Sequence, residues 1–404
     1  MLDYSEYFGI QINLLRHVPK EHRRFLHHEI PWDDRLIGIS GSRGTGKSTL
    51  LLQHLFDLEG AGQECLFLSA DHIRVQATGL YELGSGFFQT GGKKLLIDEV
   101  HKYANWAQEI KNLYDSFPAA QIVFSGSSTM KLQLGKADLS RRAVYFSLPS
   151  LSLREYILLS GGQAFSAFSL SQLLSEHVNL AKDILKAGPI LGHLKAFFDH
   201  GAYPFFLEGV GTYHARLVNV IEKILYEDIP STTGMRFSGV PVLKKILFEI
   251  ASSPPYQLNI DRLASDLQVS RPTVYNYLAY LEQAGLLKSV MPRGAGATLT
   301  RKPAKLFFEN TNLIKAAGME LKLDDSTGTL RETFFASQVQ NAGHAIRTPK
   351  HGDFLVDGDF VFEIGGKKKT SRQIAGQEHA FVVRDDIEIG SKNTIPLWLF
   401  GFLY

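Results

Sequence analysis

Residues 36–55 read LIGISGSRGTGKSTLLLQHL, and this stretch decides the fold. The apolar run at 36–39 predicts a buried strand, and the apolar spacing after residue 48 predicts a helix. Between them, residues 41–48 match the pattern G-x-x-x-x-G-K-[ST]. Glycines in such a loop let successive backbone N–H groups point at a phosphate, and the following helix adds the positive end of its dipole. The sequence therefore predicts a strand–loop–helix phosphate-binding site.

The chemistry of a triphosphate site gives the loop residues separate roles. We expect Lys47 to reach the β- and γ-phosphates and the Ser48 hydroxyl to bind Mg²⁺. ATP and Mg²⁺ are therefore the expected cofactors. The residues expected to line the nucleotide are Gly41, Ser42, Arg43, Gly44, Thr45, Gly46, Lys47, Ser48 and Thr49.

A pair of acids follows a second apolar run, at residues 95–97. We expect Asp98 to hold Mg²⁺, through water, and Glu99 to polarise the water that attacks the γ-phosphate. Because Glu99 supplies a base, hydrolysis is the expected chemistry rather than nucleotide binding alone.

Two further groups are expected to act on the γ-phosphate. Ser127 follows the apolar run 122–124, where a hydroxyl would orient the attacking water or sense the phosphate; a serine-rich turn is the alternative. Arg142, preferred over Arg141, would stabilise transition-state charge in its own subunit or in a neighbouring one. A solvated basic turn is the alternative for this arginine pair.

Composition indicates an ordinary globular protein. The chain has 404 residues, 44% apolar and 21% charged, with 43 basic and 41 acidic side chains. The single Cys65 fits a reducing compartment, and the start lacks a signal pattern. We therefore expect a cytoplasmic protein with no membrane contact. His27, His28 and Glu29 could ligate a metal, but they lack a second ligand cluster at suitable spacing and are interpreted as a solvated basic face. Short apolar runs alternate with helical segments between residues 35 and 149, which predicts a parallel sheet covered by helices; the runs are 36–39, 65–68, 95–97, 122–124 and 144–146.

The order of these motifs resembles that of prokaryotic AAA+-like ATPases close to the STAND class. The resemblance rests on residues 41–48, on LLIDEVHK at 95–102 and on LPSLSLREY at 148–156. It implies an α/β fold with a P-loop parallel sheet, followed by a helical lid, a winged helix and a small nuclease-like domain. Residues 201–204, Gly-Ala-Tyr-Pro, resemble the lid's Gly-Gly-Tyr-Pro, with Ala202 in place of the second glycine. The expected boundaries are 1–34 for an N-terminal helical segment, 35–150 for the ATPase core, 151–235 for the lid, 236–310 for the winged helix and 311–404 for the nuclease-like domain.

Residues 258–290 have the apolar spacing of helix, turn, helix and turn. Ser270 is a natural N-cap, with Pro272 just inside the second helix. The exposed residues of that helix would face a DNA groove, although winged helices of this group also serve as lids or protein contacts. The basic side chains that follow stand in a stretch without acids. The expected DNA-binding residues here are Arg271, Thr273, Arg293, Arg301 and Lys302.

The C-terminal region resembles the PD-(D/E)XK nuclease core. Asp353 and Glu363 would share a divalent metal ion there, with Glu332 on the preceding helix. The expected lysine position holds Gly365, and the nearest lysine is Lys367. The alternatives are an active nuclease and a degenerate module that binds DNA or a partner through basic residues such as Lys367 and Lys368.

The primary hypothesis is a Mg²⁺-dependent AAA+ ATPase that uses ATP to drive DNA binding or remodelling. We expect it to act as a homo-oligomer, such as a hexameric ring. One alternative is a STAND-like, nucleotide-controlled switch that binds a protein partner. Another is an ATP-gated, metal-dependent DNA nuclease.

Overall fold

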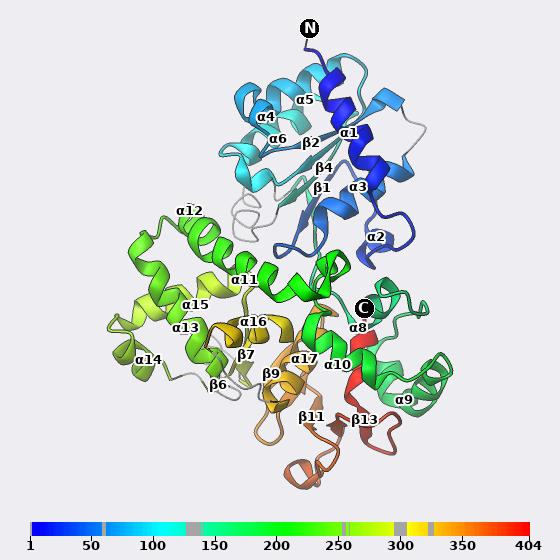
Figure 1. Ribbon diagram of the computed structural model, residues 1–404, viewed down its shortest axis with the longest axis vertical. Helices are drawn as coiled ribbons and strands as arrows, with labels where there is room; N and C mark the ends of the chain where they lie inside the picture. Colours follow the sequence, from blue (N-terminus) through cyan, green and yellow to red (C-terminus); the bar gives the residue numbers. More distant parts are fainter. Residues whose placement is uncertain are drawn as a thin grey trace. The chain divides into compact units, whose positions relative to one another are not determined.

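The computed structural model describes residues 2–58, 62–126, 139, 141–252, 256–257, 259–294, 305–321 and 327–404. The chain divides into two compact units, Met1–Pro149 and Ser150–Tyr404, which are described separately (Figure 1).

The first unit is built on a five-stranded parallel sheet with the strand order β2-β3-β4-β1-β5. Every residue of β1 and β4 is buried, whereas the edge strand β5 is partly exposed. Each of the five apolar runs predicted a strand, and all five predictions are confirmed. The strands are β1 (Leu36–Ser40), β2 (Cys65–Ser69), β3 (Lys94–Asp98), β4 (Gln121–Gly126) and β5 (Val144–Ser147).

Helices pack on both faces of this sheet (Figure 1). Alternate strand residues enter different cores because strand side chains point to opposite faces in turn. Ile97 lies in the core with Leu83 of α5 and Leu113 of α6. Its neighbour Leu96 lies in the opposite core, with Leu51 of α3. The helices of the first unit are α1 (Ser5–His17), α2 (Leu26–Glu29), α3 (Lys47–Asp57), α4 (Ile73–Thr78), α5 (Leu80–Gln89) and α6 (Trp106–Ser116), with 3-10 turns at Gly62–Glu64 and Val100–Lys102.

One side of the segment before β1 packs on α3, and its other side is exposed. His27 is buried, which corrects the interpretation of His27, His28 and Glu29 as a solvated face at that residue, whereas His28 and Glu29 are exposed. Arg24 is buried as well. The Trp32 ring stacks on His54 of α3, with centroids 3.8 Å apart and an interplanar angle of 8°. Burial lowers the pKa of His54 to about 4. The His-rich segment is thus part of the structure that supports the loop and its helix.

The second unit begins with helices, and buried polar contacts connect distant parts of it. Tyr203 is almost completely buried and accepts a hydrogen bond from Asn310 Nδ2 at 3.0 Å. The backbone N–H of Ala202 donates to Asn312 Oδ1 at 2.8 Å. Residues 201–204, which resemble the Gly-Gly-Tyr-Pro of the lid, are therefore held inside this unit by hydrogen bonds with residues 310–312. The helices are α8 (Leu153–Leu159), α9 (Leu170–Leu185), α10 (Leu191–His200), α11 (Tyr213–Lys223), α12 (Ile229–Thr233), α13 (Val240–Ser252), α14 (Ile260–Asp266), α15 (Arg271–Gln283), α16 (Thr311–Leu321) and α17 (Thr327–Asn341), with a π-helical turn at Ile224–Asp228 and 3-10 turns at Pro204–Glu208, Val210–Thr212, Phe237–Gly239, Arg372–Ile374 and Leu397–Phe402.

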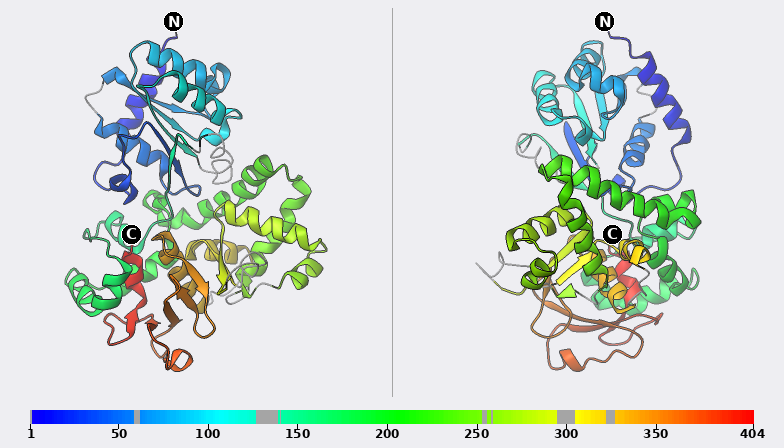
Figure 2. Two further views of the ribbon diagram at one scale, coloured as in Figure 1. Left: turned by 180° about the vertical axis from the view of Figure 1, so that it is seen from behind. Right: turned by 60° about the vertical axis from the view of Figure 1, so that its left-hand side comes forward.

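An eight-stranded mixed sheet runs through the second unit, in the order β13-β12-β11-β10-β9-β7-β8-β6 (Figure 2). The parallel pairing of β7 with β9 joins the strands of the predicted winged helix to those of the predicted nuclease-like domain. The division of residues 151–404 into three domains stays a prediction. The strands are β6 (Tyr256–Gln257), β7 (Leu287–Pro292), β8 (Lys305–Phe308), β9 (Ile346–Thr348), β10 (Phe354–Val356), β11 (Phe360–Gly365), β12 (Ala380–Arg384) and β13 (Thr394–Pro396).

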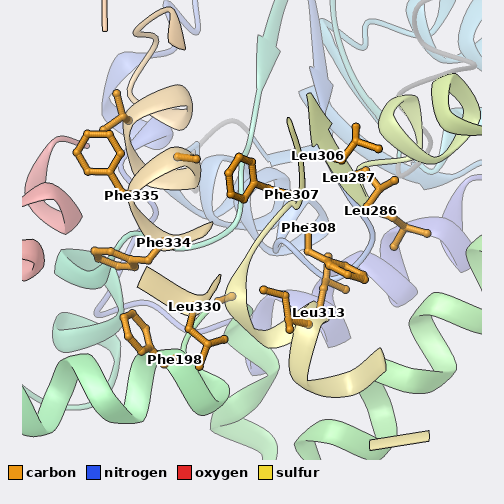
Figure 3. Close-up of a cluster of buried hydrophobic side chains, with 14 of the residues drawn as sticks. Phe198, Leu286, Leu287, Leu306, Phe307, Phe308, Leu313, Leu330, Phe334 and Phe335 are labelled. Carbon is orange, nitrogen blue, oxygen red and sulfur yellow. The ribbon is translucent and has the colours of Figure 1, made fainter. Parts of the chain in front are cut away.

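A large apolar core lies in the described part of the second unit (Figure 3), and a smaller separate cluster is formed by Leu355, Val361, Ile374, Ala380 and Val382. Phe307 and Phe308 of β8 and Phe334 and Phe335 of α17 are all almost completely buried in the large core. Aromatic side chains of this size bury large apolar areas, so residues far apart in sequence are held together. The core therefore makes α10, α16, α17 and the mixed sheet one structural body.

Candidate functional site

The loop after β1 has the backbone that its glycines predict. Gly44 and Gly46 have φ values of +87° and +94°, a conformation that L side chains rarely adopt. Gly46 is the N-cap residue of α3, so the helix begins at Lys47. At Gly41, a Cβ atom would lie 2.4 Å from the carbonyl oxygen of Leu148. Each of these three glycines is therefore required by the local geometry.

The Lys47 side chain lies across the loop. Its Nζ donates hydrogen bonds to the carbonyl oxygens of Gly41 at 3.0 Å and Ser42 at 2.9 Å. Ser48 and Thr49 are half-buried on the first turn of α3, where free N–H groups favour an anion. The loop thus combines a buried ammonium group with the N-terminus of an 11-residue helix.

Asp98 lies at the end of β3, and a serine on the next strand holds it. Ser125 Oγ donates a hydrogen bond to Asp98 Oδ1, and both residues are buried. The carboxyl ends of parallel strands meet at one edge of a sheet, so Asp98, Ser125 and the loop after β1 share that edge. Sequence reasoning placed Ser125 in the run of small hydroxyl residues at this strand end, but expected such residues to act on the water or the γ-phosphate and not to hold Asp98.

Glu99 has a strained backbone, with φ +54° and ψ +36°. Its Oε2 lies 3.3 Å from Nε2 of His101, which is 2% exposed. Sequence reasoning did not identify His101 as a functional residue. The carboxylate expected to act as the base is therefore in contact with a buried imidazole.

Arg142 is paired with an acid on the surface of the first unit. Its Nε and Nη2 donate to Asp115 Oδ1 at 2.8 Å and Oδ2 at 3.0 Å. This hydrogen-bonded guanidinium group lowers the pKa of Asp115, which lies on α6. Ser127, the other residue expected to act on the γ-phosphate, lies outside the described residues.

Arg24 brings a second buried cation to the loop. Its guanidinium group donates to the carbonyl oxygen of Thr45 and, at 2.9 Å, to that of Pro149. The side chain comes from the segment before β1, which has no recognisable motif. Arg24 therefore supports the loop from outside it, and sequence reasoning missed this role.

The predicted DNA-binding residues of α15 have structural partners. Ser270 caps the helix by accepting a hydrogen bond from the Thr273 N–H at 3.3 Å, as its N-cap position predicted. The Thr273 hydroxyl bonds the Ser270 hydroxyl at 2.8 Å. Arg271 forms an ion pair with Asp261 of α14, with 68% of its side chain exposed. Both residues thus contribute to the local fold.

Of the three other predicted DNA-binding residues, Arg293 is described by the structure. Arg293 follows β7 and is exposed, and its backbone N–H donates to the carbonyl oxygen of Thr348 at 3.2 Å. Arg301 and Lys302 lie outside the described residues. The structure therefore brings Arg293 to the joint between β7 and β9.

Carboxylates and lysines form ion pairs with one another at the predicted nuclease-like site. Glu363 of β11 is completely buried, and its Oε1 lies 2.5 Å from Lys369 Nζ. Asp353 accepts a hydrogen bond from the N–H of Ile364 at 2.8 Å, and its Oδ1 lies 3.9 Å from Lys305 Nζ. Lys305 Nζ also lies 3.3 Å from Glu332 Oε2. Burial raises the pKa of Glu363 and of Glu332.

The lysine that meets Glu363 is not the one that the sequence suggested. Lys367 and Lys368 are exposed, whereas Lys369 reaches the carboxylate. Among the described residues, no group of three or more His, Cys, Asp or Glu side chains is arranged to hold a metal ion. Nor is any helix in the described ranges long and apolar enough to cross a membrane.

Comparison with known proteins agrees with the fold of the first unit. Residues 33–157 match the family model of an AAA domain, AAA_14, which spans the five-stranded sheet and the loop. Together with the parallel sheet, this match defines the first unit as an AAA+-like P-loop domain. Residues 193–327 match the model of a domain of unknown function, DUF8612.

Individual relatives are more distant. The uncharacterized protein MJ1637 of Methanocaldococcus jannaschii is 26% identical over 367 residues, which cover 84% of this chain and 77% of that protein. The Walker-type ATPase PABY2304 of Pyrococcus abyssi has a TM-score of 0.45 and 15% identity, covering 75% of this chain and 99% of its own. AMPPCP-bound DnaA from Aquifex aeolicus has a TM-score of 0.27 and 13% identity, covering 70% and 90%.

Proposed function

We propose that this chain is a Mg²⁺-dependent ATPase of the AAA+ type. The observation that carries the proposal is the common sheet edge of the loop, the Asp98–Ser125 pair and Glu99. Residues 41–49 would bind the phosphates of ATP through backbone N–H groups, with Lys47 supplying positive charge.

The side chains at this edge fit a magnesium ion. Asp98 and Ser48 offer the carboxylate and hydroxyl oxygens that Mg²⁺ prefers, and Ser125 fixes the orientation of Asp98. When bound, Mg²⁺ would neutralise charge on the β- and γ-phosphates. Glu99 would orient the attacking water and accept its proton.

Transition-state charge would be stabilised by an arginine from a neighbouring subunit. Arg142 is half-buried and held by Asp115, so it would have to exchange this partner for a phosphate. Ser127 keeps its proposed role toward the water. Action across a subunit boundary requires a homo-oligomer, such as a hexameric ring. We expect Arg142→Ala to lower activity in assembled protein; an equal loss in a monomeric form would argue for action within one chain.

The direct test compares purified wild type with Lys47→Ala and Glu99→Gln. Wild type should release phosphate from ATP only with Mg²⁺, and magnesium nucleotide should raise its melting temperature. Lys47→Ala should lose both effects, whereas Glu99→Gln should keep the thermal shift and lose phosphate release. Normal hydrolysis by Glu99→Gln would refute the assignment of the base.

We propose that ATP hydrolysis drives DNA binding or remodelling. The residues proposed to contact DNA are Arg271, Thr273, Arg293, Arg301 and Lys302. The last three belong to a stretch, residues 283–308, that contains no acid. Phosphate contacts of this kind weaken with salt. The exposed Lys367 and Lys368 would extend the contact.

Arg293→Ala tests these proposed contacts, with the exposed Lys182→Ala on α9 as the matched control. If Arg293 contacts a phosphate, its loss should weaken DNA binding and reduce the salt slope by about 1, while the control binds normally. An ATPase rate that no DNA changes, together with no DNA binding at low salt, would contradict remodelling. That outcome would favour a STAND-like switch that binds a protein partner.

A second candidate function is ATP-gated, metal-dependent DNA cleavage. Its support is the buried Glu363 carboxylate with Asp353 and Lys369 beside it, because an acid with a raised pKa in a polar cluster is typical of functional sites. Wild type should cut DNA with Mg²⁺ or Mn²⁺ and ATP, and Glu363→Ala should not. The exposed Glu378→Ala is the matched control. Intact DNA under all conditions, or equal cutting by Glu363→Ala, would exclude this activity.

A further inference from the structure

His101 is a buried histidine whose ring reaches the acid two residues before it. The side chain is 3% exposed, and its Nε2 lies 3.3 Å from Oε2 of Glu99. The Glu99 side chain itself is 21% exposed, so one end of the pair is buried and the other is open to solvent. The imidazole can therefore restrain a carboxylate that remains accessible to water.

The backbone around Glu99 is shaped to make this contact. A left-handed conformation at a residue with a Cβ is strained, by about 1 kcal/mol or more, and Glu99 has φ +54°. A 3-10 turn, Val100–Lys102, follows at once, closed by a hydrogen bond from Lys102 N–H to the Glu99 carbonyl at 2.9 Å. Val100 is completely buried, which anchors the turn. The packing of Val100 thus maintains the strained backbone conformation of Glu99, the proposed base.

Packing alone does not account for an imidazole at this position. Val100 already supplies the apolar contact of the turn, and Asp98 is held by Ser125, not by His101. The ring lies within 3.3 Å of a carboxylate, which is a strong hydrogen-bonding partner for an imidazole. The contact therefore restricts Glu99 to few orientations.

We infer that His101 is a positioning residue that orients Glu99 toward the attacking water, an inference that rests on the proposed ATPase function. A base acts only within hydrogen-bond reach of the proton it accepts, and a misplacement of about 1 Å lowers a rate roughly 100-fold. His101 touches neither nucleotide nor water in this role. It sets the geometry of the group that does.

The test uses the full chain with His101→Ala and the conservative variant His101→Gln, which keeps a donor. His101→Ala should lower kcat about 10- to 100-fold and leave KM and the Kd for ATP unchanged. His101→Gln should recover most of the lost kcat. Adding His101→Ala to Glu99→Gln should lower kcat no further, because both changes remove one function. His17→Ala, at an exposed histidine of α1, is the matched control and should have wild-type kcat.

The possible outcomes distinguish the positioning role of His101 from the proposed ATPase function on which it rests. Wild type that hydrolyses ATP while His101→Ala has normal kcat overturns the positioning role and leaves the ATPase proposal intact. A loss of kcat accompanied by equal losses in Kd and melting temperature also overturns it, because that pattern belongs to a structural residue. Wild type that does not hydrolyse ATP overturns the proposed function and this inference together.

Discussion

At the residue scale, the site depends on polar groups that orient other polar groups. Ser125 fixes Asp98, His101 contacts Glu99, and Arg24 donates to the carbonyl of Thr45. Each supporting side chain is buried, so its partner is held in one place. The acids and the loop therefore keep a defined geometry.

Removing the Ser125 hydroxyl should loosen Asp98 without removing it. We expect Ser125→Ala to raise the Mg²⁺ concentration needed for half-maximal ATPase activity about 10-fold or more, because groups that orient metal ligands affect affinity by this much. A magnesium titration of the ATPase rate measures it. Ser116→Ala, at an exposed position on α6, is the control. An unchanged titration would show that the hydrogen bond has no role in metal binding.

Sequence reasoning identified the residues that belong to motifs and missed those that support them. Lys47 and Asp98 stand at fixed positions in recognisable patterns. Arg24 and His101 reach their partners only after folding, and isolated arginines and histidines are usually solvent-exposed or structural. Lys369 shows the same limit, because spacing favoured Lys367 and the path of the chain after β11 decided otherwise.

At the element scale, β1, the loop and α3 form one structural unit. Close contacts in this unit limit the substitutions that it can accept. The carbonyl of Ser40 accepts a hydrogen bond from the Leu148 N–H at 2.7 Å, which brings Leu148 against Gly41. Continuous apolar runs predicted the strands correctly because a parallel strand covered on both faces buries every residue, as β1 does. Asp357 and Gly358 form the tight turn between β10 and β11, with φ values of +52° and +80°.

Gly41→Ala should destabilise the unit formed by β1, the loop and α3. The new Cβ would lie 2.4 Å from the Leu148 carbonyl oxygen, and relieving such a contact costs about 1–3 kcal/mol. Hydrogen exchange in peptides from residues 36–57 should speed up in the variant. Gly9→Ala is the matched control, because nothing lies within 4 Å of its Cβ and it stands on an exposed face of α1. Equal exchange in Gly41→Ala and wild type would contradict this account of the loop.

At the scale of the whole molecule, two compact units divide the proposed work. The first contains the proposed ATP site, and the second contains the predicted DNA-binding and nuclease-like residues. The boundary between them follows Pro149, close to the end of the predicted ATPase core. The continuous sheet of the second unit was not predicted, because the pairing of β7 with β9 joins residues that no local pattern connects.

The most direct measurement is the identity of the nucleotide that the protein retains. Purified wild type, Lys47→Ala and Glu99→Gln are incubated with Mg²⁺ and ATP, freed of unbound nucleotide, denatured and analysed by chromatography. In this account, the loop binds ATP and Glu99 is the base for its hydrolysis. Wild type should then retain ADP, Glu99→Gln should retain ATP, and Lys47→Ala should retain neither. ADP in Glu99→Gln at the wild-type level, or no nucleotide in wild type, would contradict the account.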